Sequence, residues 1–134
     1  MPRVLVDMSC TLLHHGHVRL LKKAAEHGDV IVALTTDEQI LAHKGYLPEL
    51  SYKERAEIVG AIRYVDEVIP SDWLINDEFI ERNDIDILVH GDDNVNNLKS
   101  CEVKIFPRTF GISSSKIRSK TKNIEAEQLD KRLS

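Results

Sequence analysis

The stretch "DVIVALTT", residues 29–36, is a nearly continuous run of apolar and β-branched side chains. Such a run is typical of a strand buried on both faces, as the strands of parallel sheets are. A second short run rich in valine and leucine, "RVLVDMS" at residues 3–9, predicts another strand. Between them, residues 17–28 carry apolar side chains at helical spacing and end in Gly28, a common helix terminator. This order of strand, helix and strand predicts a βαβ unit with parallel strands.

The alternation continues through the rest of the chain. Ser51 and Glu54 in "SYKER" have the spacing of a capping box and predict a helix start. The other predicted elements are a strand at residues 65–70 ended by Pro70, a helix at 76–83, strands at 86–91 and 101–107, and a last helix nucleated by "SSSKIRSK" at 113–120. Together they predict an α/β fold, namely a three-layer, Rossmann-like, doubly wound parallel sheet. Ligands in such sheets bind beyond the carboxyl ends of the strands, close to helix N-termini.

Length and composition indicate one ordinary globular domain. The chain has 134 residues, 42% of them hydrophobic and 30% charged, so we expect one domain over residues 1–120 and a polar tail or helix over 121–134. A net charge of −4 and a pI near 5.8 argue against nucleic acid as the main partner. Cys10 and Cys101 form no disulfide framework, and the N-terminal "MPRVLVD" is neither a secretory signal nor a membrane span. The sequence therefore predicts a cytoplasmic protein without a membrane partner.

The stretch "CTLLHHGH", residues 10–17, lies between the first predicted strand and the first predicted helix. His14 and His17 are three residues apart, so they project to the same side of the first helical turn. Gly16 lets a ligand approach the backbone closely, and the helix N-terminus offers free N–H groups and partial positive charge. These features indicate a phosphate site.

Two other interpretations of this stretch stay open. The histidines can be surface or capping residues of a helix start, with no ligand at all. Alternatively, four side chains can bind zinc, namely Cys10, His14, His15 and His17. Zinc is the weaker interpretation, because structural zinc sites usually draw ligand pairs from two separated segments and these four come from one.

A second anion site is predicted at "RTFGISSSKIR", residues 108–118. Arg108 follows the last predicted strand, Gly111 permits a tight turn, and three serines start a helix. These serines are Ser113, Ser114 and Ser115. An ordinary serine-capped helix has the same pattern. Two phosphate-suited helix starts in one small domain nevertheless favour a polyphosphate ligand.

Charged side chains elsewhere are further candidates for ligand binding. Lys44 and Gly45 lie in a stretch expected to be a loop, which can close over phosphates. Arg55 and Arg63 add positive charge, and Asp92 in "HGDDN" follows a predicted strand, where it can meet a nucleotide or a metal. Each basic residue can equally be a solvated charge, and Asp92 can equally cap a helix.

Together these segments resemble the small cytidylyltransferases of the HxGH nucleotidyltransferase superfamily, most closely the glycerol-3-phosphate branch. The resemblance covers nearly all of residues 2–118. In chain order, it rests on "LLHHGH", "GDVIVALTTDE", "SYKER", "IRYVDEVIP", "HGDD" and "RTFGISSSKIR".

The resemblance implies transfer of a cytidylyl group from CTP to a small phosphate- or phosphonate-bearing acceptor, with release of pyrophosphate. It implies that His14, His17, Lys44 and Arg108 are catalytic. The implied nucleotide-binding residues are Ser9, Cys10, His14, Gly16, His17, Asp92, Arg108, Thr109, Gly111, Ile112, Ser113, Ser114 and Ser115. The implied acceptor-binding residues are Lys44, Arg55 and Arg63. It also implies a homodimer, and Mg²⁺ carried by the triphosphate with no protein residue assigned as its ligand.

Three positions depart from the pattern of this family. Thr11 stands where the family has an aspartate associated with the metal. Tyr46 and Asn76 stand where the glycerol-3-phosphate branch has lysines, so the acceptor need not be glycerol 3-phosphate. Two alternatives follow: an ATP-using adenylyltransferase of the same superfamily, such as the heptose-phosphate enzymes, or a nucleotide-binding protein that has lost catalysis.

Overall fold

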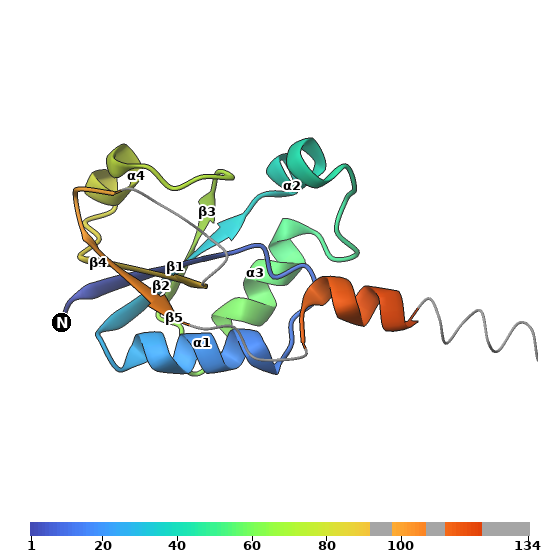
Figure 1. Ribbon diagram of the computed structural model, residues 1–134, viewed down its shortest axis with the longest axis horizontal. Helices are drawn as coiled ribbons and strands as arrows, with labels where there is room; N and C mark the ends of the chain where they lie inside the picture. The colour runs from blue at the N-terminus through green and yellow to red at the C-terminus, as the bar shows by residue number, and fades with distance from the viewer. Residues whose placement is uncertain (92–97, 107–111, 122–134) are drawn as a thin grey trace, which may run out of the picture.

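The protein, described from a computed structural model, is built around a five-stranded parallel sheet, and the structure describes residues 1–91, 98–106 and 112–121. The elements in chain order are β1 (Arg3–Met8), α1 (His15–Ala25), β2 (Asp29–Thr35), α2 (Asp37–Lys44), α3 (Tyr52–Gly60), β3 (Glu67–Ser71), α4 (Asp77–Arg82), β4 (Ile87–Gly91) and β5 (Glu102–Phe106). A further helix spans residues 114–121. Figure 1 shows it beyond one end of the sheet.

The sheet has the strand order β3-β2-β1-β4-β5. β1 lies in the middle, where Val4 pairs with Val30 of β2 on one side and with Ile87 of β4 on the other. The order therefore reverses between β1 and β4, and ligands of doubly wound sheets bind at the carboxyl ends of such strands. The predicted Rossmann-like α/β fold is confirmed.

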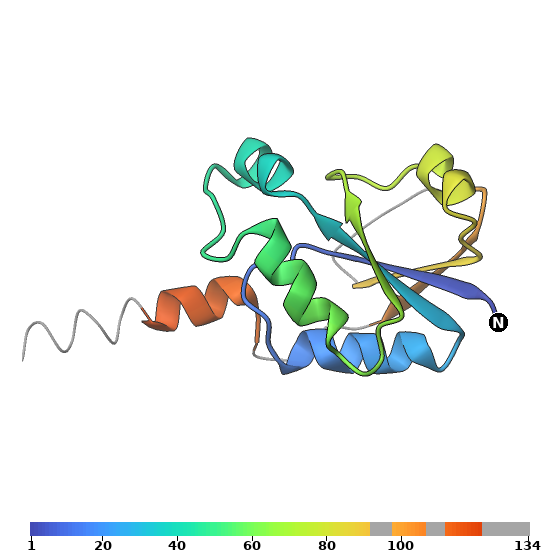
Figure 2. The same ribbon diagram turned by 180° about the vertical axis from the view of Figure 1, so that it is seen from behind.

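Helices cover both faces of the sheet, which makes the three predicted layers (Figures 1 and 2). α1 and α3 pack on one face, and α4 packs on the other. Successive residues of β1 serve opposite layers: Val4 and Val6 belong to the α1 and α3 core, whereas Leu5 packs in the core that contains Ile80 of α4. Both faces are apolar because both are buried, which explains the continuous apolar runs in the sequence.

One predicted helix start is confirmed at α3, and the structure adds one helix, α2, that the sequence did not predict. Ser51 and Glu54 form the predicted capping box of α3, with Glu54 N–H to Ser51 Oγ at 3.3 Å. α2 was not predicted, although Thr36 caps its start and Gly45 ends it in a left-handed conformation with φ 76°. Only Ile40 of α2 is buried, so the helix has almost no apolar periodicity to reveal it.

Pro70 does not end its strand as predicted. β3 continues to Ser71, and Pro70 pairs with Leu34 of β2. β3 is an edge strand, and a proline is tolerated there because its missing N–H can face solvent.

Gly28 lies where the chain leaves α1 and turns into β2. Asp29 donates its N–H to the Pro2 carbonyl at 2.9 Å, which brings two backbone segments together. A Cβ atom on Gly28 would lie 2.2 Å from the Pro2 carbonyl oxygen, and Gly28 has φ +157°. Only glycine fits this crossing without displacing backbone.

Among the described residues, no helix is both long and apolar enough to cross a bilayer.

Candidate functional site

The two histidines His14 and His17 sit at the start of α1, directly beyond the carboxyl end of β1. His14 is the N-cap residue, and its Nδ1 accepts the Gly16 N–H at 3.0 Å. His17 returns the contact, because its Nδ1 accepts the His14 N–H at 3.1 Å. The rings lie side by side, with centroids 4.0 Å apart. The prediction that these histidines cap a helix start is therefore confirmed, because both bond to backbone N–H groups at the N-terminus of α1.

These backbone contacts fix the tautomer of both rings in their neutral form. A nitrogen that accepts an N–H carries no proton, so a neutral ring holds its proton on Nε2. Burial, reinforced by the neighbouring His14, lowers the pKa of His17 to about 4. His17 is therefore neutral at pH 7 and presents an Nε2–H donor to whatever binds beside it.

Gly16 is required by the His14 ring itself. A Cβ atom on Gly16 would lie 2.8 Å from His14 Cε1 and 2.9 Å from its Nδ1. The same atom would lie 3.4 Å from Ile112 Cγ2, so the two predicted anion sites meet at this glycine. We predicted from the sequence that a ligand approaches the backbone at Gly16. In the structure, the His14 ring occupies the space beside this glycine.

The start of helix 114–121 is joined to the histidine loop. Ser114 Oγ donates to the Leu12 carbonyl at 2.7 Å and lies 3.3 Å from the Leu12 N–H. Ser113 caps the helix by accepting the Lys116 N–H at 3.1 Å, and Ser115 is exposed. Ser114 therefore holds the two segments together. The predicted ligand residues Asp92, Arg108, Thr109 and Gly111 lie outside the described residues.

Cys10 belongs to the core that α1 and α3 cover. It is 5% exposed, its backbone has φ 49°, and burial raises the pKa of its thiol to about 12. No group of three or more His, Cys, Asp or Glu side chains within the described residues is placed to hold a metal ion. Next to Cys10, Thr11 is only 2% exposed.

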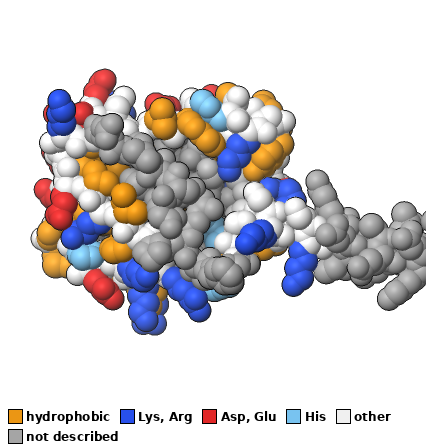
Figure 3. Space-filling view, viewed as in Figure 1, with side chains coloured by type: hydrophobic (Ala, Val, Ile, Leu, Met, Phe, Trp, Pro, Cys, Tyr) orange, Lys and Arg blue, Asp and Glu red, His pale blue; other side chains and the backbone are white. Residues whose placement is uncertain are grey.

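Lys44 lies at the carboxyl edge of the sheet, but as the last residue of α2 and not in a loop. Its Nζ is 5.8 Å from the centre of the Trp73 ring, and the neighbouring His43 stacks on Trp73 with centroids 4.6 Å apart. Trp73 follows β3 closely. Figure 3 shows hydrophobic side chains, a histidine and a basic side chain gathered over α2.

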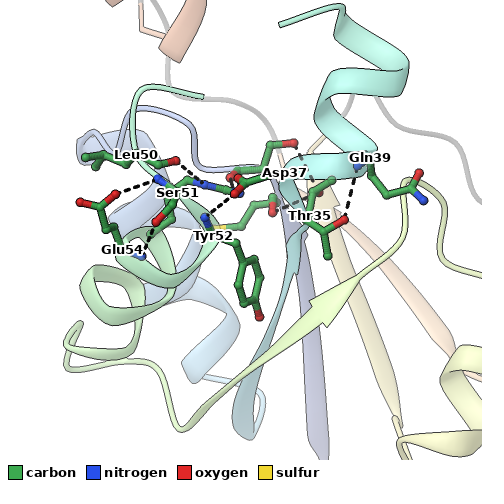
Figure 4. Close-up of polar contacts among 11 residues, drawn as sticks. Thr35, Asp37, Gln39, Leu50, Ser51, Tyr52 and Glu54 are labelled. Atoms are coloured by element: carbon green, nitrogen blue, oxygen red, sulfur yellow. Dashed lines mark hydrogen bonds and ion pairs between the residues drawn. The ribbon is translucent and has the colours of Figure 1, made fainter. Parts of the chain in front are cut away.

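Arg55 is buried in the first turn of α3 and holds that region together. It is 1% exposed, and its Nη2 pairs with Asp37 Oδ1 at 2.7 Å. Its Nη1 donates to the Ser9 carbonyl at 2.6 Å and its Nε to the Leu50 carbonyl at 3.2 Å. Figure 4 shows how Asp37, Leu50 and Tyr52 converge here.

The prediction that Arg55 binds the acceptor is therefore not supported, because its guanidinium is already bonded on three sides. Partial burial raises the pKa of Asp37, but the Tyr52 N–H and Arg55 outweigh it and hold this pKa below its usual value. Arg55 thus supports the loop after β1 through Ser9. Its spacing of four from the buried Val59 was the signal in the sequence that it faces inward.

Arg63, the other arginine predicted to bind the acceptor, lies past the far end of α3. It follows the carboxyl end of α3, and three residues later Asp66 donates its N–H to Val30 at the start of β2 at 2.9 Å. Arg63 therefore lies near the amino ends of the strands, whereas His14 lies beyond the carboxyl ends. A nine-residue helix spans about 13 Å, so one chain does not bring Arg63 to the histidines.

A family model described as "Cytidylyltransferase-like" matches residues 11–120. The chain belongs to the cytidylyltransferase-like family. It is 43% identical over 126 residues to the glycerol-3-phosphate cytidylyltransferase of Staphylococcus aureus, covering 88% of this chain and 93% of that protein. It is 37% identical over 118 residues to the FAD synthase of Thermococcus kodakarensis, covering 87% and 78%.

The fold of this cytidylyltransferase-like protein also occurs in a solved structure. The lipopolysaccharide core biosynthesis protein from Thermoplasma volcanium superposes with a TM-score of 0.65 over 81% of this chain and 97% of that one. At 21% identity, this likeness concerns the fold alone. The cytidylyltransferase-like chain thus presents paired histidines and the start of helix 114–121 in one place, with Lys44 at the same edge of the sheet.

Proposed function

We propose that the protein is a nucleotidyltransferase that moves a cytidylyl group from CTP to a small phosphate- or phosphonate-bearing acceptor and releases pyrophosphate. The main support for this proposal is the pair His14 and His17, whose Nδ1 atoms accept backbone N–H groups, so that each neutral ring carries its proton on Nε2. They stand at a helix N-terminus at the strand-order reversal, where anions bind. Membership of the cytidylyltransferase-like family supports the same reaction class.

In the proposed reaction, an oxygen of the acceptor phosphate attacks the α-phosphorus of CTP in line, and the bond to the β-phosphate oxygen breaks. Negative charge grows on the α-phosphate oxygens and on the leaving pyrophosphate. The Nε2–H groups of His14 and His17 would donate to these oxygens, and because the rings are already fixed they need little reorganisation. Lys44 would draw the two anionic reactants together. No covalent intermediate with the enzyme is required.

Several residues of this proposal lie in segments that the structure does not describe. Arg108, Thr109 and Gly111 would hold the outer phosphates together with Ser113 at the start of helix 114–121, and Asp92 would contact the nucleoside. Cytoplasmic location and a homodimer complete the proposal. A dimer would be tested by sedimentation equilibrium over a range of protein concentrations.

Magnesium enters the proposal only as the counter-ion of the triphosphate. Thr11 stands at the position of the family aspartate, and its buried hydroxyl carries no charge with which to attract an ion. The described residues do not fit a protein-held Mg²⁺, which prefers carboxylate and water ligands. We expect turnover to require relatively high Mg²⁺ and Thr11→Asp to lower that requirement. A Mg²⁺ titration of turnover for both proteins measures it, and identical curves would contradict the expectation.

The decisive experiment is pyrophosphate release, with the four nucleoside triphosphates crossed against small phosphates and phosphonates, preceded by thermal unfolding with CTP or ATP. We expect CTP to raise the melting temperature more than ATP does, because a ligand of the folded state stabilises it. Stronger stabilisation by ATP would assign the chain to adenylyl transfer. Stabilisation by CTP without turnover on any acceptor would make it a nucleotide-binding protein.

Variants at the histidines test the mechanism. His14→Ala and His17→Ala should each lower turnover about a hundredfold, as the loss of a transition-state donor does. His27→Ala is the matched control, because His27 lies past the other end of α1 and stacks on Phe106. Near-normal turnover in either active-site variant would remove that histidine from the mechanism.

A further inference from the structure

Helix 114–121 is attached to two different parts of the site region. At its first turn, Ser114 bonds to Leu12, in the loop that leads to His14. One turn later, Arg118 reaches the segment between α2 and α3, which begins directly after Lys44. The helix therefore connects the histidine side of the site with the Lys44 side. Figures 1 and 2 show it between the start of α1 and this segment.

Arg118 holds this segment through two residues. It forms a bidentate ion pair with Glu49, from Nε to Oε1 at 2.7 Å and from Nη2 to Oε2 at 2.6 Å. Its guanidinium also lies 4.8 Å from the centre of the Tyr46 ring, with Nη1 3.4 Å from the Tyr46 hydroxyl. Paired hydrogen bonds and the contact with the ring together fix the orientation of the guanidinium, which a single ammonium group cannot do.

The segment after Lys44 begins with a glycine, which has no side chain to anchor it. Gly45 ends α2 in a left-handed conformation, and a Cβ atom there would have no neighbour within 4 Å. Tyr46 is the next residue, so Arg118 contacts the chain two positions from Lys44. The far end of the segment is fixed separately, because Arg55 binds the Leu50 carbonyl.

The ion pair is partly exposed, which limits what it can do for the fold as a whole. The side chains of Arg118 and Glu49 are 18% and 51% exposed, and such pairs contribute little to global stability. Its effect is therefore local. It restricts where the segment, and with it the end of α2, can move.

We propose that Arg118 is a positioning residue for Lys44: by clamping Tyr46 and Glu49 it holds the end of α2 at the acceptor side of the site. This inference rests on the proposed function, because it gives Lys44 the acceptor phosphate to bind. It assigns no direct ligand contact to Arg118.

The test is steady-state kinetics with CTP and glycerol 3-phosphate, together with CTP binding measured by calorimetry without acceptor. Arg118→Ala and Glu49→Gln should each lower kcat/KM for glycerol 3-phosphate about tenfold and leave the CTP dissociation constant within about twofold. Glu49→Gln removes the pair from the other side, so the test does not depend on one variant. Lys120→Ala is the matched control, an exposed cation in the same helix, and should match the parent.

Coupling to Lys44 separates positioning from general weakening. In a Lys44→Ala background, adding Arg118→Ala should lower kcat/KM for glycerol 3-phosphate by less than about twofold, because the residue that Arg118 positions is already absent. A full tenfold additional loss, or an equal loss of CTP affinity, would overturn the inference. If the parent binds CTP but turns over none of the small phosphates and phosphonates of the pyrophosphate-release panel, the proposed function fails instead. A parent that turns over while Arg118→Ala and Lys120→Ala behave alike refutes only the clamp.

Discussion

Replacing Gly16 with alanine should impair the proposed chemistry while leaving the fold almost unchanged. The added Cβ atom would lie 2.8 Å from His14 Cε1, whereas carbon atoms in contact prefer about 3.5 Å or more. The His14 ring must therefore retreat by about 0.7 Å, which breaks its alignment with the Gly16 N–H. Because a misplacement of about 1 Å can cost about a hundredfold in rate, we expect turnover to fall roughly ten- to a hundredfold.

Stability should respond far less to this substitution. Weakening the cap contact costs about 1 kcal/mol. Alanine recovers up to about 1 kcal/mol, because it is a better helix former than glycine. The free energy of unfolding, measured in urea, should therefore change by less than about 1 kcal/mol.

Gly60→Ala is the matched control, because a Cβ atom there would meet only Val68 Cγ2 at an ordinary 3.8 Å. It should keep full turnover in the pyrophosphate-release assay. Gly16→Ala with turnover within twofold of the parent would refute the role assigned to the His14 ring. A large loss of stability in Gly16→Ala would show that the contact serves the fold and not the site.

Three further substitutions test the remaining structural arguments. Gly28→Ala should lower the free energy of unfolding by about 2–3 kcal/mol in urea, because its Cβ atom would meet the Pro2 carbonyl oxygen at 2.2 Å; an unchanged midpoint would contradict this. Burial, reinforced by His14, lowers the pKa of His17 to about 4. Between pH 6.5 and pH 4, His17 therefore binds a proton in the unfolded chain but stays neutral in the folded protein. Stability should therefore fall on acidification through this range, and fall less in His17→Gln; parallel pH profiles would refute the assignment. Arg55→Met should destabilise the protein by about 2–4 kcal/mol, because it leaves Asp37 without its guanidinium partner, and Arg55→Lys should recover only part of that loss.

The fold was predictable because its main signal is apolar burial. β1 and β2 are buried on both faces, so their sequences are continuous apolar runs. α3 begins at the predicted capping box, because Ser51 and Glu54 bond to each other's backbone. α2 was not predicted, because this helix at the rim of the sheet buries only Ile40 and so has no repeating apolar pattern in its sequence. Its end residues, Thr36 and Gly45, were the remaining signal.

The candidate site was predictable where its residues are close in sequence. His14 and His17 share one helical turn, so their spacing alone brings them together. Basic residues were harder, because sequence gives their charge but not their direction. Arg55 faces inward and serves the loop after β1, and Arg63 lies at the opposite edge of the sheet. Arg118 gave no such signal, since its contacts with Glu49 depend on where helix 114–121 packs.

The mutual capping of His14 and His17 has a consequence for how this protein can change over generations. The contacts of the Nδ1 atoms that orient the rings also close the first turn of α1. Substitutions at position 14 therefore affect the stability of the helix start as well as activity. A descendant freed from catalysis would still need an acceptor side chain there, and serine, asparagine or aspartate would supply one. Alanine at that position would weaken the helix start, so selection for a folded protein would act against it. We therefore expect a descendant that has lost catalysis but still folds to carry one of these three residues at the helix start.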